Sequence, residues 1–187
     1  RSSDLADLGD LNADTFPDLV LTIPDAGNPE ANPGQVAVLI NAGNSGPAWN
    51  GFVPSSQVTF NTGRNPQEVV IARLRGNAQP PDLAVACAAD NTVQTFSNSG
   101  LAVFSPAGTF SSGGLRPLDI DAADFTGDGV ADLAVTNYGD INPPPEQQLP
   151  DRGNARILNN NGSGAFTPAD TLTTGWYPLS LALADLN

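Results

Sequence analysis

The sequence contains no lysine, no histidine and no methionine, and Cys87 is its only cysteine. Without histidine, the chain has no imidazole for acid–base catalysis or for a zinc site. A single cysteine forms no disulfide within the chain. Its position in the apolar run DLAVAC predicts a buried, unreactive thiol. The chain therefore lacks the side chains on which several common enzyme classes depend.

Positive charge and long apolar runs are also scarce. Seven Lys plus Arg residues stand against 20 Asp plus Glu, which gives a net charge of −13. Binding to nucleic acid or to an anionic membrane surface needs a basic face, so we expect neither. No run approaches membrane-spanning length, so we expect no membrane insertion, and no secretory signal is present. The chain opens on arginine, and we expect that a segment precedes it.

Helical periodicity is missing, and short β-prone runs take its place. They are DLVLTI, QVAVLI, EVVIA, DLAVA, TVQTF, LAVTN and ARIL, each bounded by Gly, Pro, Asn or Asp. The chain also holds 19 Gly and 17 Pro, which suits frequent turns. This pattern is typical of an all-β protein with many short strands.

A repeat organises these runs. The segments TFNTGRNPQEVVIA, TFSSGGLRPLDIDAA and TLTTGWYPLSLALA share a Gly-x-x-Pro connection that ends at Pro66, Pro117 and Pro178. An Asn/Gly turn precedes each connection, and an acidic segment follows two of them. Each unit predicts four strands in one antiparallel sheet. Such sheets bury both faces when they stack radially as the blades of a β-propeller.

The predicted propeller is incomplete. We place the blade units at about 1–63, 64–114 and 115–175, with 176–187 starting the next blade. A closed propeller has about four to eight blades. We therefore expect 1–187 to be a single partial β-propeller domain, about three blades of a larger propeller. Its open edges would need further blades or another chain.

The acidic loops have the spacing of a metal site. Side-chain oxygens stand at positions 1, 3, 5 and 9, with a backbone carbonyl at position 7, and Ca²⁺ takes about six to eight oxygen ligands. The predicted ligands are Asp10, Asn12, Asp14, Asp18 and the Phe16 carbonyl; Asp124, Thr126, Asp128, Asp132 and the Val130 carbonyl; and Asp185 and Asn187 at the start of a third loop. A plain Asp/Asn/Gly turn is the alternative. The repeated spacing and the crowded like charge favour calcium.

The middle unit departs from this pattern. Arg73 and Arg75 replace the first two oxygen ligands, and one extra residue precedes Asp82. We expect no calcium in this loop. Two interpretations remain open: a guanidinium takes the place of the cation and pairs with Asp82, or the loop is degenerate and solvated.

These motifs resemble a known family. DFTGDGVADLAVTN, NNNGSGAF and the recurring Gly-x-x-Pro lead are similar to FG-GAP/VCBS repeats, the blades of integrin-α-like β-propellers. The resemblance implies Ca²⁺ sites between the first two strands of a blade that mainly rigidify the propeller. It also implies that ligands meet the opposite face.

On that opposite face we expect two long Pro-rich loops, at 24–35 and 139–155. The candidate ligand-binding residues there are Arg64, Arg116, Trp176 and Tyr177. Packing between blades is the alternative role for the two aromatic residues, and simple solvation is the alternative for the arginines.

The sequence thus predicts a calcium-stabilised, non-catalytic binding or adhesion module. We expect an extracellular, secreted or cell-surface location and a protein or glycan partner on the face opposite the calcium loops. Two alternatives remain. One is the scaffold of a secreted hydrolase or lyase whose catalytic residues lie outside this chain. The other is a structural element of a surface layer or fibre.

Overall fold

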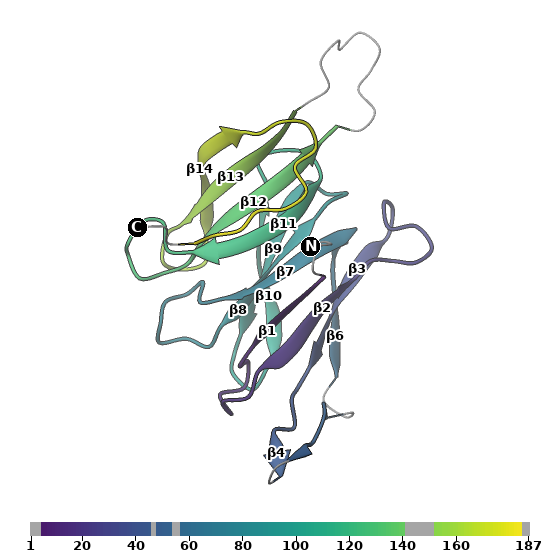
Figure 1. Cartoon of the computed structure of the whole chain (residues 1–187), viewed down its shortest axis with the longest axis vertical. Coiled ribbons are helices and arrows are strands. Elements are labelled where there is room, and N and C mark those ends of the chain that lie inside the picture. The colour runs from purple at the N-terminus through teal and green to yellow at the C-terminus, as the bar shows by residue number, and fades with distance from the viewer. Residues whose placement is uncertain (1–4, 46–47, 54–56, 141–151, 185–187) are drawn as a thin grey trace.

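The computed structural model describes residues 5–45, 48–53, 57–140 and 152–184, and these ranges hold strands and no helix. Figure 1 shows three four-stranded antiparallel sheets. The first contains β1 (Ala6–Gly9), β2 (Asp18–Ile23), β3 (Pro33–Leu39) and β6 (Val58–Arg64). The second contains β7 (Pro66–Ala72), β8 (Asp82–Cys87), β9 (Thr92–Asn98) and β10 (Phe104–Ser111). The third contains β11 (Pro117–Ala123), β12 (Asp132–Gly139), β13 (Arg152–Asn160) and β14 (Phe166–Thr173).

Each sheet is an up-and-down meander, in which neighbours in sequence are neighbours in space. A fourth, two-stranded ribbon pairs β4 (Asn44–Ser45) with β5 (Ala48–Trp49) and extends from the first sheet. In the described part of the chain, no helix is long and apolar enough to cross a membrane.

The second strand of the middle sheet explains how the sheets stack. All six residues of β8 are buried. Side chains alternate between the two faces of a strand, so Leu83 and Val85 pack toward the first sheet while Ala84 and Ala86 pack toward the third. This strand therefore lies in two cores at once, as the near-continuous apolar run DLAVAC indicates.

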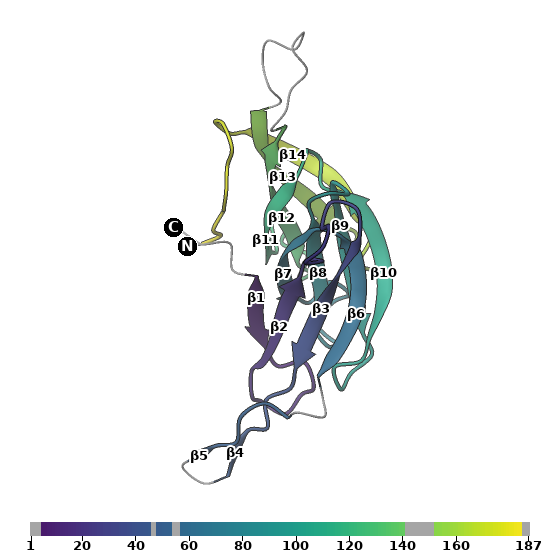
Figure 2. The ribbon, with the colours of Figure 1, turned by 90° about the vertical axis from the view of Figure 1, so that its right-hand side faces the viewer.

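Two hydrophobic cores separate the three sheets (Figure 2). Between the first and second sheets lie Leu11, Val20, Val36, Val38, Val69, Leu83, Val85, Cys87, Phe96 and Ala102. Between the second and third lie Val70, Ala72, Leu74, Ala84, Ala86, Val93, Ile120, Leu133, Val135, Leu158 and Phe166. Burial of each large side chain contributes about 1.5–3 kcal/mol. Four-stranded sheets stacked face to face in this way are propeller blades, so the predicted all-β propeller architecture is confirmed.

The single thiol is buried as predicted. Cys87 is fully inaccessible to solvent, and its burial raises the pKa of the thiol to about 12. A thiol that stays protonated is a poor nucleophile. Cys87 is therefore a core residue.

The connections between blades have a repeated, unusual backbone. Asn65, Arg116 and Tyr177 each precede a proline, and their φ angles are 53°, 55° and 55°. Residues other than glycine adopt this left-handed region uncommonly. The same turn thus follows the last strand of each of the three sheets. The last of these turns leads into 178–184, which forms no strand in the described structure; the Leu181 N–H donates to Asp119 Oδ2 on β11 at 2.6 Å.

Two of these turns are followed by a proline that lies against a glycine. A Cβ on Gly34 would stand 2.3 Å from Pro66 Cδ, and one on Gly153 would stand 2.1 Å from Pro178 Cδ. Contacts under about 3 Å are forbidden to real Cβ atoms, so only glycine allows the third strand to meet the next connection this closely.

We predict that Gly34→Ala destabilises the fold by about 1–3 kcal/mol, because its new methyl group overlaps the Pro66 ring. Urea unfolding measures this effect. Gly175→Ala is the matched control, because no heavy atom lies within 4 Å of its Cβ position. Equal unfolding midpoints for the two variants would show that the Gly34–Pro66 contact does not constrain the blades.

Candidate functional site: the acidic loops

The first acidic loop connects β1 to β2 and is organised around Asp10. Its carboxylate accepts N–H bonds from Asn12 at 3.3 Å, Asp14 at 3.2 Å and Thr15 at 2.8 Å. The Asp14 carboxylate accepts in turn from the Phe16 N–H at 2.9 Å. The side chains at positions 1 and 5 therefore fold the loop around themselves.

The loop between β11 and β12 repeats this arrangement. Asp124 accepts N–H bonds from Gly127 at 2.6 Å, Asp128 at 3.2 Å and Gly129 at 2.8 Å, and Asp128 accepts from Val130 at 2.9 Å. These bonds stabilise the charged form, so they lower the pKa of Asp124, with the Gly129 bond as the largest cause.

Both loops make the same sharp turn after position 5. Thr15 has φ 76° and Gly129 has φ 86°. The sequence indicated Gly129 as the natural residue for this turn and Thr15 as the less suitable one. The structure shows that Thr15 adopts the left-handed conformation nonetheless, at a cost in strain that glycine avoids.

Position 9 of each loop is a buried carboxylate at the start of the second strand. Asp18 and Asp132 are fully buried, and Asp82 of the middle blade is 2% exposed. Each accepts the backbone N–H of an asparagine that follows the third strand or ends it. The pairs are Asn41–Asp18 at 2.9 Å, Asn98–Asp82 at 2.9 Å and Asn160–Asp132 at 2.7 Å. Sequence analysis placed Asp18 and Asp132 only among metal ligands, and it missed this role of the asparagines in the Asn/Gly turns.

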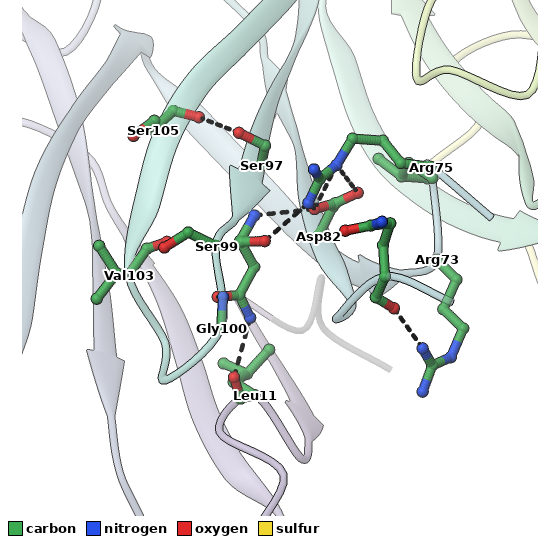
Figure 3. A network of polar contacts seen from close by, with 12 residues as sticks. Leu11, Arg73, Arg75, Asp82, Ser97, Ser99, Gly100, Val103 and Ser105 are labelled. Carbon is green, nitrogen blue, oxygen red and sulfur yellow. Dashed lines mark hydrogen bonds and ion pairs between the residues drawn. The ribbon is translucent and has the colours of Figure 1, made fainter. Parts of the chain in front are cut away.

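The asparagine side chains also link neighbouring blades. Asn98 Nδ2 donates to the Leu11 carbonyl of the preceding blade at 2.9 Å, and Asn160 Nδ2 donates to the Leu74 carbonyl at 2.8 Å. Leu11 and Leu74 are the second residues of their loops. The first two loops are therefore each bonded to the turn of the next blade, and Figure 3 shows this bond at Leu11.

Asp18 is a buried carboxylate that lies close to other acidic side chains. Burial raises its pKa, and the charges of Asp14 and Asp10 raise it further, while N–H bonds from Asn41 and Leu11 lower it in part. Among the ion pairs of the described residues, none involves Asp18 or Asp132. A cation near position 9 would relieve this repulsion.

The middle blade supplies such a cation from its own loop (Figure 3). Arg75 Nη2 lies 2.7 Å from Asp82 Oδ1 and Arg75 Nε lies 3.0 Å from Asp82 Oδ2, and Nη2 also donates to the Asn98 carbonyl at 2.7 Å. The pairing of a guanidinium with Asp82 is confirmed, and the alternative of a solvated loop is wrong for Arg75. Arg73 donates instead to the Asn77 and Gln79 carbonyls.

The donor set of the two acidic loops fits a hard divalent cation. Every predicted ligand is an oxygen, and a carboxylate that accepts one N–H keeps further lone pairs for a metal. Arg75 shows that a positive group is accommodated beside the position 9 carboxylate. Among the residues in the four described ranges, however, no three Asp, Glu or Cys side chains converge as a ready metal cage. Asp185 and Asn187 lie outside the described residues.

The predicted ligand-binding arginines lie at the other end of the blades and are paired. Arg64 Nε lies 2.6 Å from Asp90 Oδ1, and Arg116 Nη2 lies 3.3 Å from Glu30 Oε1. A cavity of about 250 Å³ opens beside Glu30 and Arg116. Both guanidinium groups therefore already bind carboxylates.

The predicted aromatic pair lies at the last connection. Tyr177 stacks on Tyr138 of β12 with ring centroids 4.7 Å apart, and Trp176 lies beside Tyr177 at 6.2 Å. Both side chains remain exposed. Tyr177, in the connection that follows the third sheet, thus packs against β12 of that sheet and borders the same end as Arg116. Residues 141–151 of the predicted Pro-rich loop lie outside the described residues.

One comparison with known proteins bears on these loops. Residues 81–135 match the family model of the FG-GAP-like repeat. The chain contains an FG-GAP-like repeat. The matched stretch starts beside Asp82 and runs through the acidic loop of the third blade, so the FG-GAP-like repeat spans from the second strand of one sheet to the second strand of the next. No curated protein matches the chain.

We predict that Arg75→Met lowers the free energy of unfolding by about 2–3 kcal/mol. Loss of one partner of a buried pair costs about 3–5 kcal/mol, and we expect a smaller loss here because Arg75 is partly exposed. Urea denaturation is the measurement. Arg73→Met is the control, because Arg73 is exposed and binds only carbonyls. If Arg75→Met and Arg73→Met had equal effects, the ion pair would not stabilise the blade.

Proposed function

We propose that this chain is a calcium-stabilised, non-catalytic binding module of an extracellular or cell-surface protein. The supporting observation is a difference between the loops that precede the second strand of each sheet. Asp82 has a guanidinium beside it, whereas Asp18 and Asp132 form no ion pair with a basic side chain among the residues that the structure describes. A bound divalent cation would supply there the charge that Arg75 supplies in the middle blade.

The residues that would hold calcium belong to two complete loops. They are Asp10, Asn12, Asp14, Asp18 and the carbonyl of Phe16 in one, and Asp124, Thr126, Asp128, Asp132 and the carbonyl of Val130 in the other. Bound calcium would supply positive charge and fix these oxygens. Each loop leads into the second strand of its blade, and its position 9 carboxylate binds the asparagine turn after the third strand. A fixed loop would therefore stiffen its blade.

The type of site that we propose supports an extracellular setting. Modules outside the cell bind calcium with dissociation constants of about 10⁻⁴–10⁻³ M, which matches the calcium available there. The loops are short and partly exposed, which suits this weak class.

A rigid propeller would serve to present loops to a partner. The end away from the acidic loops carries Glu30, Asp90, Arg64 and Arg116, bonded to one another across two blades and their connections. Loops held on a rigid scaffold are common binding sites. We place a protein or glycan partner at that end, with Trp176 and Tyr177 at its border.

We predict that calcium raises the melting temperature and that a chelator lowers it. Each filled site adds RT ln(1 + [Ca²⁺]/Kd) to the free energy of unfolding, about 2.7 kcal/mol at a hundredfold excess over Kd. Terbium luminescence counts the sites, and we expect two.

Single substitutions assign those sites. Asp10→Asn and Asp124→Asn should each remove one terbium site. Asp25→Asn is the control, because Asp25 also accepts backbone N–H bonds but lies in the loop between β2 and β3. A melting temperature that ignores both calcium and chelator would refute the proposal, as would a terbium count that the loop variants leave unchanged.

A further inference from the structure

The first blade carries a projecting hairpin that the proposed function does not use. Residues 41–53 lie between β3 and β6 and contain the β4–β5 ribbon, which extends away from the three sheets in Figures 1 and 2. Backbone hydrogen bonds join its two arms. The N–H groups of Ala42, Asn50 and Val53 donate to the carbonyls of Gly51, Gly43 and Ile40, respectively. The equivalent turns of the other two blades are short, so this hairpin is an addition to the blade.

The base of the hairpin is fixed to the first acidic loop. A Cβ on Gly43 would stand 2.5 Å from the Phe16 ring, so this ring packs on the glycine backbone. Asn41 Nδ2 donates to the Pro17 carbonyl at 3.0 Å. The hairpin is therefore held in a defined direction.

Trp49 presents its ring to solvent in a fixed orientation. It is 60% exposed. Its Nε1–H donates to Asn41 Oδ1 at 2.8 Å, and Phe52 contacts it edge to face with centroids 5.5 Å apart. These two contacts restrain the rotation of the ring. Little conformational entropy remains to be lost when a ligand stacks on the ring.

The hairpin that carries this ring is polar and uncharged. No charged residue occurs between Glu30 and Arg64 in a chain whose net charge is −13. Exposed amides of Asn44 and Asn50 flank Trp49 in the hairpin. An indole face offers an apolar, electron-rich surface, and amides offer both donors and acceptors. The ring C–H face of a pyranose and its hydroxyl groups match this combination.

We propose that the 41–53 hairpin is a binding platform for a neutral carbohydrate, with Trp49 as the stacking residue. A cationic ligand would also favour an aromatic face. The hairpin supplies no carboxylate to pair with it, which favours the neutral sugar. This site is separate from the partner end proposed above, and none of the proposed calcium ligands belongs to the hairpin, so we expect sugar binding with or without calcium.

Nuclear magnetic resonance of the two indole N–H signals, Trp49 and Trp176, tests the proposal. The probes are cellohexaose, maltohexaose, mannohexaose and chitohexaose, with hexagalacturonate and choline as charged comparisons, each at up to ~10 mM to detect weak binding. We expect at least one neutral oligosaccharide to shift the Trp49 signal and to leave the Trp176 signal in place, with chelator present or absent.

Variants separate stacking from general loss of structure. Trp49→Ala should weaken binding at least about tenfold, Trp49→Phe should retain part of it, and the control Leu172→Ala, which changes an exposed apolar residue of β14, should leave it unchanged. The proposal is overturned if no neutral oligosaccharide moves the Trp49 signal, if only choline or hexagalacturonate does, or if Trp49→Ala binds normally. The terbium count is a separate measurement, so either proposal can fail without the other.

Discussion

A buried carboxylate that must be hydrogen-bonded holds each blade together. An ionised carboxylate removed from water is costly unless donors surround it. Asp18, Asp82 and Asp132 meet this requirement with the N–H of an asparagine at or just past the end of the neighbouring strand. In the second and third blades, the same asparagine reaches back to the loop of the preceding blade. The need to satisfy one buried group thus connects strands within a blade and blades with one another.

The same carboxylate also needs a counter-charge, and the chain meets this need in the described residues only once. Arg75 pairs with Asp82, although the arginine occupies a place where the other loops have oxygen ligands. This difference explains why one design of loop tolerates both an arginine and clustered acids. In our proposal, a loop with the arginine keeps the stability of its blade independent of metal. A loop with clustered acids makes the stability of its blade depend on a bound cation. A chain with both kinds would retain one fixed blade between two calcium-sensitive ones.

The distribution of charge divides the first blade into two surfaces. The acidic loop concentrates carboxylates, whereas the hairpin beside it has none and exposes an aromatic ring. Their contact through Phe16 and Gly43 is apolar. A charged loop and a neutral hairpin therefore lie next to each other without competing for the same ligand.

The repeat, the short strands and the acidic spacing were all predictable from the sequence, because each depends on local periodicity and on turn residues such as Gly129 and Pro66. The resemblance to FG-GAP repeats rested on the same local patterns. The choice of Arg75 over Arg73 as the partner of Asp82, the interblade bonds of Asn98 and the fixed ring of Trp49 were not predictable. Arg73 and Arg75 look equivalent in sequence, and only the path of the loop turns Arg75 toward the carboxylate. Local residues determine which strands and turns form, whereas contacts between blades decide which polar groups meet, because those groups come from segments far apart in the chain.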